Sequence, residues 1–263
     1  MSGRLTVIGL GPGESALLTP QAQAALAEAD ALYGYWPYLD RVPARDGQSR
    51  HVSDNREEGA RAAAALAHAA AGANVAVVSG GDPGVFAMAT AVCEQIEAGP
   101  AAWRALDVRV VPGITAMLAV AARVGAPLGH DFCALSLSDN LKPWEAIERR
   151  LDAAASAGFV IALYNAASRA RPWQIGVALE RLRRHLPATT PVVFGRAVSR
   201  PDERITVTTL TDADPAGIDM ATLIIVGSAE TRTVGRPGLP PLVYSPRGQS
   251  QPGRADSIPE SSA

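Results

Sequence analysis

A glycine-rich loop directly after an apolar run constrains this chain more than any other feature. Residues 74–79 read Asn-Val-Ala-Val-Val-Ser, which is typical of a buried parallel strand, and residues 80–86 read Gly-Gly-Asp-Pro-Gly-Val-Phe. Two glycines let the backbone approach a ligand that any Cβ would block, and the proline fixes the exit of the loop. Ligands of open α/β sheets bind at the carboxyl ends of the strands. The sequence therefore predicts a ligand-binding loop at this point of an α/β sheet.

Two further loops of the same kind follow expected strands. Residues 9–13 read Gly-Leu-Gly-Pro-Gly, and residues 112–116 read Pro-Gly-Ile-Thr-Ala. A dinucleotide-binding role of the first loop is disfavoured, because Glu14 stands where the third glycine of that fingerprint belongs and Pro12 lacks an amide. No Gly-Lys-Ser/Thr motif for phosphate is present either. The three loops together predict a shared cleft for a small molecule.

The chain alternates strands and helices nearly throughout, which predicts an α/β fold with two α/β domains. We expect domains over residues 1–112 and 113–234, followed by a disordered tail, 235–263, rich in proline, glycine and serine. A helix is expected to begin at Thr19-Pro20, with the hydroxyl as N-cap. Further helices are expected at 55–71, 85–96, 115–124, 143–155 and 172–185. Strands are expected at 5–10, 74–79, 108–111, 133–137, 159–163, 191–195, 203–210 and 222–227.

Composition excludes several classes of protein. A net charge of −2 over 263 residues argues against broad electrostatic binding to nucleic acid. Two cysteines, Cys93 and Cys133, cannot form a disulfide framework or a cysteine-based zinc site, and the four histidines lack metal-ligand spacing, so no metal is expected. No signal peptide and no apolar run of the ~20 residues that a membrane span needs is visible. We expect a cytoplasmic protein that binds neither membrane nor nucleic acid.

The order of the motifs resembles the tetrapyrrole (corrin/porphyrin) methyltransferases over residues 5–231. The motifs are GLGPG at 9–13, LTPQAQAAL at 18–26, GYWPY at 34–38, SGGDPGVFAM at 79–88, the run at 111–144, YN at 164–165 and ATLIIVG at 221–227. Within this family, residues 125–144 most resemble the ring-contracting member. One departure is that Ala166 follows the YN motif, where the family usually has proline.

The resemblance implies a function, a cofactor and an assembly. It implies two α/β domains with S-adenosyl-L-methionine in the cleft between them, S-adenosyl-L-homocysteine as product, and a homodimer. The implied reaction is methylation of precorrin-3B at carbon 17, with ring contraction to precorrin-4, in cobalamin (vitamin B12) biosynthesis. Two alternatives stay open: another precorrin or uroporphyrinogen-type methyltransferase of the superfamily, and a non-catalytic protein that has kept the ligand cleft.

The candidate cofactor residues lie on these loops. Backbone groups at Gly80 and Gly81 can satisfy the polar ends of the cofactor without placing a charge beside its sulfonium. Asp82 either accepts hydrogen bonds from the cofactor or fixes its own turn. Thr115 and Ala116 begin a helix, where free amides favour a carboxylate. Tyr164 and Asn165 could flank the adenine, or Tyr164 is an ordinary aromatic at a sheet edge. The resemblance adds Pro12, Val85, Phe86, Ala221 and Thr222.

The substrate side is expected to supply a general base and cationic partners. The resemblance implies loss of a proton from a substrate hydroxyl, and we assign Asp139 as the base, with Ser136 and Ser138 as its hydrogen-bonding partners and Lys142 holding a carboxylate. Alternatively, 138–140 is only a helix-entry turn, or His130 is the base. Cationic candidates for substrate carboxylates are Arg41, Arg56, Lys142, Arg169, Arg196 and Arg200. Aromatic side chains that could cover a macrocycle, or else pack in the core, are Tyr33, Tyr35, Trp36 and Tyr38.

Overall fold

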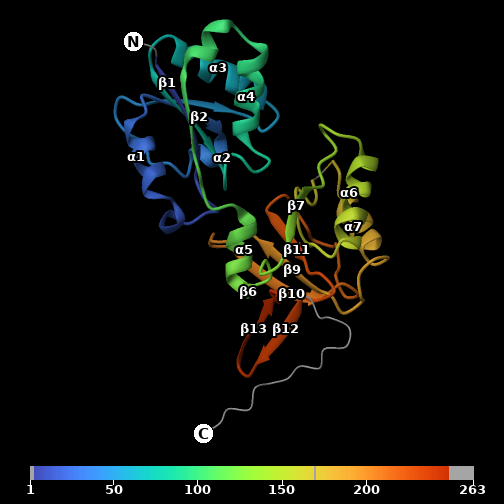
Figure 1. Ribbon diagram of the computed structural model, residues 1–263. Helices are drawn as coiled ribbons and strands as arrows, with labels where there is room; N and C mark the ends of the chain where they lie inside the picture. The colour runs from blue at the N-terminus through green and yellow to red at the C-terminus, as the bar shows by residue number, and fades with distance from the viewer. Residues whose placement is uncertain (1–2, 169, 249–263) are drawn as a thin grey trace. The chain divides into compact units, whose positions relative to one another are not determined.

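The chain forms two compact units in the computed structural model, which describes residues 3–168 and 170–248 (Figure 1). The first unit comprises Met1–Val120 and Ala197–Arg204, and the second comprises Ala121–Arg196 and Ile205–Ala263. The division differs from the expected boundary at residue 112. It also places 197–204 in the first unit, although sequence order assigned this segment to the second.

The first unit is built on a five-stranded parallel sheet in the order β3-β2-β4-β1-β5. The expected strands at 5–10, 74–79 and 108–111 are confirmed, whereas β2 and β3 were not predicted. The strands are β1 (Arg4–Gly9), β2 (Ala31–Tyr35), β3 (Ser49–Ser53), β4 (Asn74–Ser79) and β5 (Asp107–Val111). Because all five run in the same direction, their carboxyl ends meet at one edge of the sheet.

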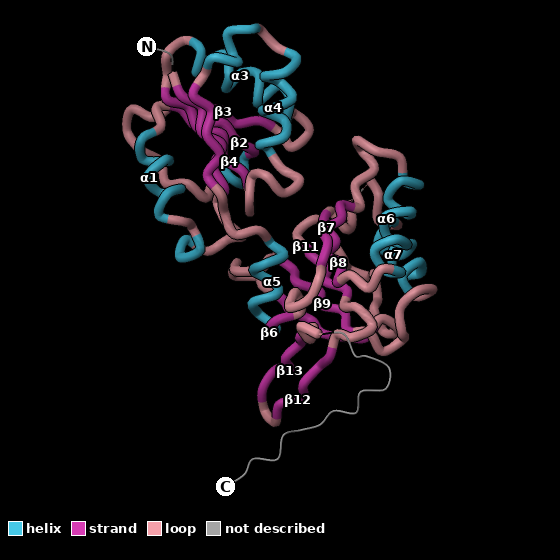
Figure 2. Tube along the Cα trace, in the orientation of Figure 1, coloured by secondary structure: helices cyan, strands magenta, loops and turns pink. Residues whose placement is uncertain are grey.

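Helices cover both faces of this sheet, as the alternation of side chains along the strands requires. Leu5, Val7, Val75 and Val77 pack against α3 and α4, whereas Ile8, with Ala76 and Val78, packs against α1 and α2. Figure 2 shows α1 and α3 on opposite sides of these strands. The helices are α1 (Pro20–Glu28), α2 (Trp36–Leu39), α3 (Glu58–Ala70) and α4 (Met88–Ala98).

The helix starts obey local chemistry. Thr19 Oγ1 accepts a hydrogen bond from the Ala22 amide at 3.1 Å, with Pro20 at the first helical position, which confirms the predicted cap. Glu57 accepts from the Asp54 amide at 2.8 Å before α3, the backward contact of a capping box. The first turn expected for this helix is absent, since α3 begins at Glu58.

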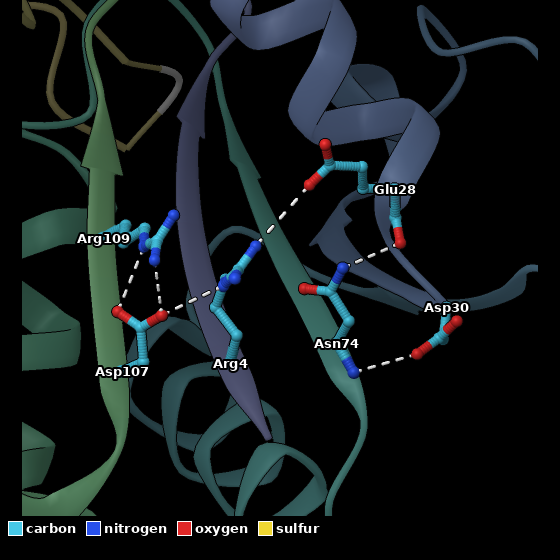
Figure 3. Close-up of polar contacts among 6 residues, drawn as sticks. All are labelled: Arg4, Glu28, Asp30, Asn74, Asp107 and Arg109. Atoms are coloured by element: carbon cyan, nitrogen blue, oxygen red, sulfur yellow. Dashed lines mark hydrogen bonds and ion pairs between the residues drawn. The ribbon is translucent and has the colours of Figure 1, made fainter. Parts of the chain in front are cut away.

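Polar side chains interact with one another at the amino-terminal edge of the first sheet, where β1, β4 and β5 begin (Figure 3). Asp107 accepts from Arg4 at 3.0 Å and from Arg109, and Asn74 donates to the Glu28 carbonyl at 2.7 Å. The Arg109 guanidinium, and secondarily that of Arg4, lowers the pKa of the Asp107 carboxyl. These exposed pairs contribute little to stability, and they lie at the edge of the sheet opposite the glycine loops.

The second unit has a mixed five-stranded sheet in the order β10-β9-β11-β8-β7. Strands β7 and β8 are parallel, and β11 is antiparallel to both β8 and β9. Helices α6 and α7 bury Leu151 and Leu179 against Ile161, Val192 and other strand residues. The elements are α5 (Ala116–Val124), which begins in the first unit, β7 (Phe132–Ser136), α6 (Trp144–Ser156), β8 (Val160–Tyr164), α7 (Gln174–Leu182), β9 (Pro191–Arg196), β10 (Arg204–Thr209) and β11 (Thr222–Val226).

The expected disordered tail is wrong over its first part. Strands β12 (Arg232–Arg236) and β13 (Leu239–Tyr244) form an antiparallel hairpin, and β13 also pairs with β6 (Gly125–Ala126). Burial of Val243 and a hydrogen bond from the Ser245 hydroxyl to the Pro127 carbonyl at 2.6 Å attach the hairpin to the rest of the unit. Composition could not reveal these long-range pairings. The remainder of the predicted tail, 249–263, lies outside the described residues.

A stacked pair of rings on β2 and β3 is expected to make the stability of the first unit depend on pH. His51 stacks on Tyr33 with ring centroids 4.2 Å apart, and His68 lies edge-on to both rings. Burial and the neighbouring His68 lower the pKa of His51. The unfolded chain then binds more protons, so stability falls as the pH decreases through the ordinary histidine pKa of about 6.5.

We expect His51→Phe to reduce this acid sensitivity, because phenylalanine keeps a ring against Tyr33 and does not titrate. The Tm lost between pH 7.5 and pH 5.5 should be smaller in the variant by roughly 1–3 °C. Calorimetry at both pH values measures this difference. Equal losses in the two proteins would contradict the assignment.

Candidate functional site

The three glycine-rich loops meet at the carboxyl edge of the first sheet. The Gly11 amide donates to the Gly81 carbonyl at 3.1 Å, and the Gly81 amide donates to the Gly11 carbonyl at 2.9 Å. The third loop joins them through the Gly113 amide, which donates to Asp82 Oδ2 at 3.1 Å. The convergence of the loops predicted from sequence is therefore confirmed.

Side chains cannot be added at these contacts. A Cβ on Gly9 would lie 2.7 Å from both the Gly113 nitrogen and the Gly81 oxygen, and a Cβ on Gly113 would lie 2.2 Å from that same oxygen. Gly11 and Gly81 have φ angles of 65° and 66°, in the left-handed region that glycine enters without strain. Bare backbone at this edge is thus dictated by packing between the loops.

Asp82 fastens the loops to one another. Its Oδ1 accepts from the Gly84 amide at 2.8 Å, and its Oδ2 accepts from the Gly113 amide at 3.1 Å. The first bond fixes the aspartate's own turn, which was one of the two roles considered for it. The second ties the loop at 80–86 to the loop at 112–116.

The aromatic group divides between the core and the loops. Tyr33 belongs to the core, Trp36 is exposed, and the ring of Tyr38 covers Gly80, where a Cβ would lie 2.6 Å from Tyr38 Cε1. Burial raises the pKa of Tyr38, and the guanidinium groups of Arg200 and Arg41 oppose this effect. Tyr38 therefore marks the place where two arginines approach the glycine loops.

Arg41 forms hydrogen bonds with backbone carbonyls of the first glycine-rich loop. Its Nη2 donates to the carbonyls of Leu10, Gly11 and Gly13 at 2.6, 3.0 and 3.4 Å. Burial, with a contribution from Arg200, lowers the pKa of Arg41 to about 10, so the group stays charged at neutral pH. A single guanidinium nitrogen thus donates to three carbonyl groups of this loop, in which Pro12 has no amide hydrogen to donate.

The segment 197–204 packs on the same loop. The Ser199 hydroxyl accepts from the Glu14 amide at 3.2 Å, and Arg200 Nε donates to the Pro12 carbonyl at 3.1 Å. The Glu203 carboxylate accepts from the Ser199 amide. Ser199 was not predicted from the sequence, since no local pattern connects positions 185 residues apart.

Among residues 3–168 and 170–248, four residues other than glycine have positive φ angles, and all lie in loops. They are Phe86 at 52°, Asn165 at 54°, Ala197 at 48° and Ser199 at 59°. Such residues cost about 1–3 kcal/mol each and persist where the surrounding structure fixes them, which is commonest at functional sites. Two of them, Phe86 and Asn165, are predicted cofactor residues.

The remaining cofactor candidates of the first unit differ in exposure. Phe86 is exposed, Val85 and Ala116 are half-buried, and Pro12 and Thr115 are buried. A cofactor could therefore meet Phe86 and Val85 through their side chains. At Pro12 and Thr115, backbone groups are the atoms to consider.

The candidates of the second unit gather at one edge of its sheet. Because β11 runs antiparallel to β8 and β9, its start lies beside the ends of those two strands, and β7 ends beside β8. Asn165 Nδ2 donates to Ser136 Oγ at 2.9 Å, and the Leu137 amide donates to the Tyr164 carbonyl at 2.9 Å. Ala221 is exposed there, whereas Thr222 is buried and donates to Asp219 Oδ1 at 3.0 Å.

Asp139 has different partners from those expected. Its Oδ1 accepts from Arg171 at 2.6 Å and from Gln174 at 3.1 Å, whereas Ser136 Oγ accepts from the Ser138 amide at 3.3 Å. The prediction of Ser136 and Ser138 as partners of this carboxylate is wrong. Arg171 and Gln174 were missed because they follow β8 and lie more than 30 positions along the chain.

The predicted cations have separate surroundings. Burial, followed by the charge of Arg150, lowers the pKa of Lys142. Arg196 donates to Asp219 Oδ2 at 2.9 Å, and Arg56 is exposed. His130, the alternative base, accepts from the Asp131 amide at 2.6 Å and is thereby tied into its turn. Arg169 lies outside the described residues.

Over 3–168 and 170–248, no group of three or more histidine, cysteine, aspartate or glutamate side chains is placed to hold a metal ion. No helix in this part of the chain is long and apolar enough to cross a membrane. The polar groups of the candidate site are backbone amides and carbonyls, arginines, single carboxylates, and the hydroxyl and amide side chains described above.

The α/β architecture and its glycine-rich strand ends are those of a class of methyltransferases. The chain matches the model of the tetrapyrrole (corrin/porphyrin) methylases over residues 4–214. It belongs to this family, as its motifs indicated.

Three known proteins illustrate the likeness. The chain is 63% identical, over 247 residues, to a precorrin-3B C(17)-methyltransferase from a Sinorhizobium species. The match covers 94% of this chain and 97% of that protein. The crystal structure of the methyltransferase CobJ matches with a TM-score of 0.89 and 51% identity, over 93% of this chain and 100% of that one. A uroporphyrin-III C-methyltransferase from Thermus thermophilus, complexed with S-adenosylhomocysteine, shares the fold with a TM-score of 0.65 and 24% identity, over 86% of this chain and 98% of that one.

Proposed function

We propose that this chain transfers a methyl group from S-adenosyl-L-methionine to carbon 17 of precorrin-3B, with contraction of the ring to precorrin-4, in cobalamin biosynthesis. One observation carries the choice of substrate: the identity of 63% to a precorrin-3B C(17)-methyltransferase extends over nearly the whole of both chains. Other members of the family methylate other tetrapyrrole positions, and they remain the alternative.

The glycine edge of the first unit fits the methyl donor. A Cβ at position 9 or 113 would clash with backbone atoms, and Gly81 has a positive φ that disfavours other residues, so backbone carbonyl and amide groups lie between these loops. Such groups can hold the polar ends of the cofactor and leave its positive sulfonium uncompensated. When bound, S-adenosylmethionine supplies an electrophilic methyl group. A donor with S-adenosylhomocysteine as its product is also supported by the Thermus thermophilus complex.

Several residues are assigned to hold the donor in this proposal. In the first unit, the loops contribute Pro12, Gly80, Gly81, Asp82, Val85, Phe86, Thr115 and Ala116. In the second unit, Tyr164 and Asn165, with Ala221 and Thr222, are assigned to the adenine side.

The second unit supplies the proton chemistry in this proposal. Asp139 Oδ1 is occupied by Arg171 and Gln174, whereas Oδ2 has no hydrogen-bond partner among the described residues, and the side chain is 23% exposed. We assign Oδ2 to accept the proton of the substrate hydroxyl, while Arg171 holds the carboxylate in place. We assign the Ser138 hydroxyl to form a hydrogen bond with the same substrate hydroxyl. Lys142, without an ion pair in the described ranges, binds a substrate carboxylate.

Product analysis tests the proposed reaction. Purified protein is incubated with precorrin-3B and S-adenosylmethionine, and the product is examined by mass spectrometry and NMR. The proposal predicts a gain of one methyl group together with an acetyl-bearing contracted ring. A methylated product with an uncontracted ring would favour a sister enzyme, and S-adenosylhomocysteine binding without turnover would favour the non-catalytic alternative.

Asp139→Asn tests the proposed base. The amide keeps the shape that Arg171 and Gln174 contact but cannot take a proton, so kcat should fall about 10²–10⁴-fold. The affinity for S-adenosylhomocysteine should stay within twofold. Single-turnover kinetics and calorimetric titration measure the two quantities.

Asp152→Asn is the matched control. Asp152, on α6, accepts from Arg181 on α7 and from His185 in the turn after it, so this change also weakens an arginine–carboxylate pair. Its kcat should remain near the wild-type value. Equal losses in the two variants would assign Asp139 to structure only.

The proposal extends to assembly and compartment. We assign a homodimer, whose interface uses the helix expected at 143–155, observed as α6, or the edge of the sheet in the second unit. Light scattering during size exclusion measures the mass in solution.

We assign the cytoplasm as the compartment, which is consistent with Cys93 and Cys133 being free thiols.

A further inference from the structure

Several features of the first unit combine to place Arg200 beside the loop at 10–13. Its Nε donates to the Pro12 carbonyl at 3.1 Å, and its amide donates to the Ala197 carbonyl. Gly13 leaves room for its stem, because a Cβ there would lie 2.6 Å from Arg200 Cγ. The left-handed residues Ala197 and Ser199 precede it. The side chain is exposed, but the hydrogen bond at Nε holds it in place. Its two terminal nitrogens therefore occupy a fixed position beside the loop.

A second guanidinium lies behind the same loop without an anion. Arg41 Nη2 is used by three carbonyls, whereas Nε and Nη1 are buried and have no hydrogen-bond partner in the described part of the chain. Arg41 and Arg200 donate to carbonyls of the same loop, Arg200 to that of Pro12, which places the two charges near each other. Within 3–168 and 170–248, neither Arg41 nor Arg200 forms an ion pair with a carboxylate. Two neighbouring positive charges that lack an internal counter-ion favour an external one.

We propose that Arg200, supported by Arg41, forms a carboxylate-binding subsite beside the loop at 10–13. The planar fork of arginine matches a carboxylate geometrically. The inference rests on the proposed function, since two carboxylate sources meet this protein there: the side chains of the tetrapyrrole and the methionine end of the cofactor.

Two substitutions at Arg200 separate binding from a purely structural role. In Arg200→Gln, Nε2 can occupy the place of arginine Nε and still donate to the Pro12 carbonyl, but the charged fork is lost. In Arg200→Lys, the charge remains, but a methylene replaces that donor. A carboxylate subsite predicts that glutamine is the more damaging change for binding. A staple between 197–204 and the loop predicts that lysine is the more damaging one.

Three ligands identify the source of the carboxylate without turnover. Uroporphyrin III, whose pyrrole side chains all end in carboxylates, is titrated by fluorescence. S-adenosylhomocysteine and 5′-methylthioadenosine, which lacks the amino-acid end, are titrated by calorimetry. A substrate subsite predicts about tenfold weaker uroporphyrin binding by Arg200→Gln with both nucleosides unchanged. A cofactor subsite predicts about tenfold weaker S-adenosylhomocysteine binding with methylthioadenosine and uroporphyrin unchanged.

Arg104→Gln is the matched control, because Arg104 is also exposed and also donates to one carbonyl, that of Glu97 at 2.8 Å, just before β5 begins. It should leave all three affinities within twofold. The proposal is overturned if Arg200→Gln does the same, or if Arg200→Lys loses more affinity than Arg200→Gln. These binding measurements remain decisive if precorrin-3B proves not to be the substrate.

Discussion

Gly113→Ala is expected to weaken the binding of S-adenosylhomocysteine at least about 100-fold. The new Cβ would lie 2.2 Å from the Gly81 carbonyl oxygen and within 3.0 Å of Gly9 backbone atoms, so no flexible side chain can relieve the contact. The loops must separate by about 1 Å, and a displacement of this size in a positioning element costs on the order of 10²-fold. Overpacking of this kind also lowers the free energy of unfolding by about 1–3 kcal/mol. Calorimetric titration and thermal unfolding measure the two effects.

Gly59→Ala provides the control within the same unit. Gly59 lies in α3, and a Cβ there would meet Gln95 Nε2 at 3.5 Å, an ordinary contact. This variant should bind as tightly as the wild type and gain about 0.5–1 kcal/mol of stability, since alanine is the better helix former. Wild-type affinity in Gly113→Ala would show that bare backbone at this junction is not required.

Asp82→Ala is expected to loosen the junction between two loops. It leaves the Gly84 and Gly113 amides without their acceptor, and the loss at the part-buried Gly113 amide costs about 1–3 kcal/mol, whereas the exposed Gly84 amide can bind water. S-adenosylhomocysteine affinity should fall about 10–100-fold, because one loop is no longer tied to the next. Asp82→Asn retains one carbonyl oxygen and should lie between the wild type and alanine in both measurements.

The comparison of stability with affinity separates the two roles considered for Asp82. If the carboxylate fixes the loops, affinity and unfolding free energy decline together through the series aspartate, asparagine, alanine. If it mainly contacts the cofactor, asparagine loses as much affinity as alanine while stability hardly changes. Asp214→Ala is the control, because Asp214 accepts from the Ala216 amide two positions on and from no other group among the described residues.

The site of the first unit could be predicted to the extent that it depends on local pattern. The apolar run at 74–79 and the glycine loop after it gave a strand end, and parallel strands bring such ends to one edge. The Thr19 cap follows equally from neighbouring residues. Strand β3 was missed because an edge strand with exposed side chains carries no apolar run.

The contacts that complete the site depend on residues far apart in the chain. Ser199 and Arg200 reach the loop at 12–14 across more than 180 positions, and Arg171 reaches Asp139 across 32. Composition likewise misjudged 235–244, where pairing of β13 with β6 orders a proline-containing segment. Periodicity reports which face of an element is buried, but it does not report which distant segment covers that face.

Hydrogen–deuterium exchange with and without saturating S-adenosylhomocysteine tests most directly whether the three loops hold the cofactor. Peptides that cover residues 9–13, 80–87 and 112–116 are predicted to exchange more slowly in the complex, with the peptide at 101–106 unchanged. Unaltered exchange in all three loops, at a concentration that calorimetry shows to be saturating, would contradict the account.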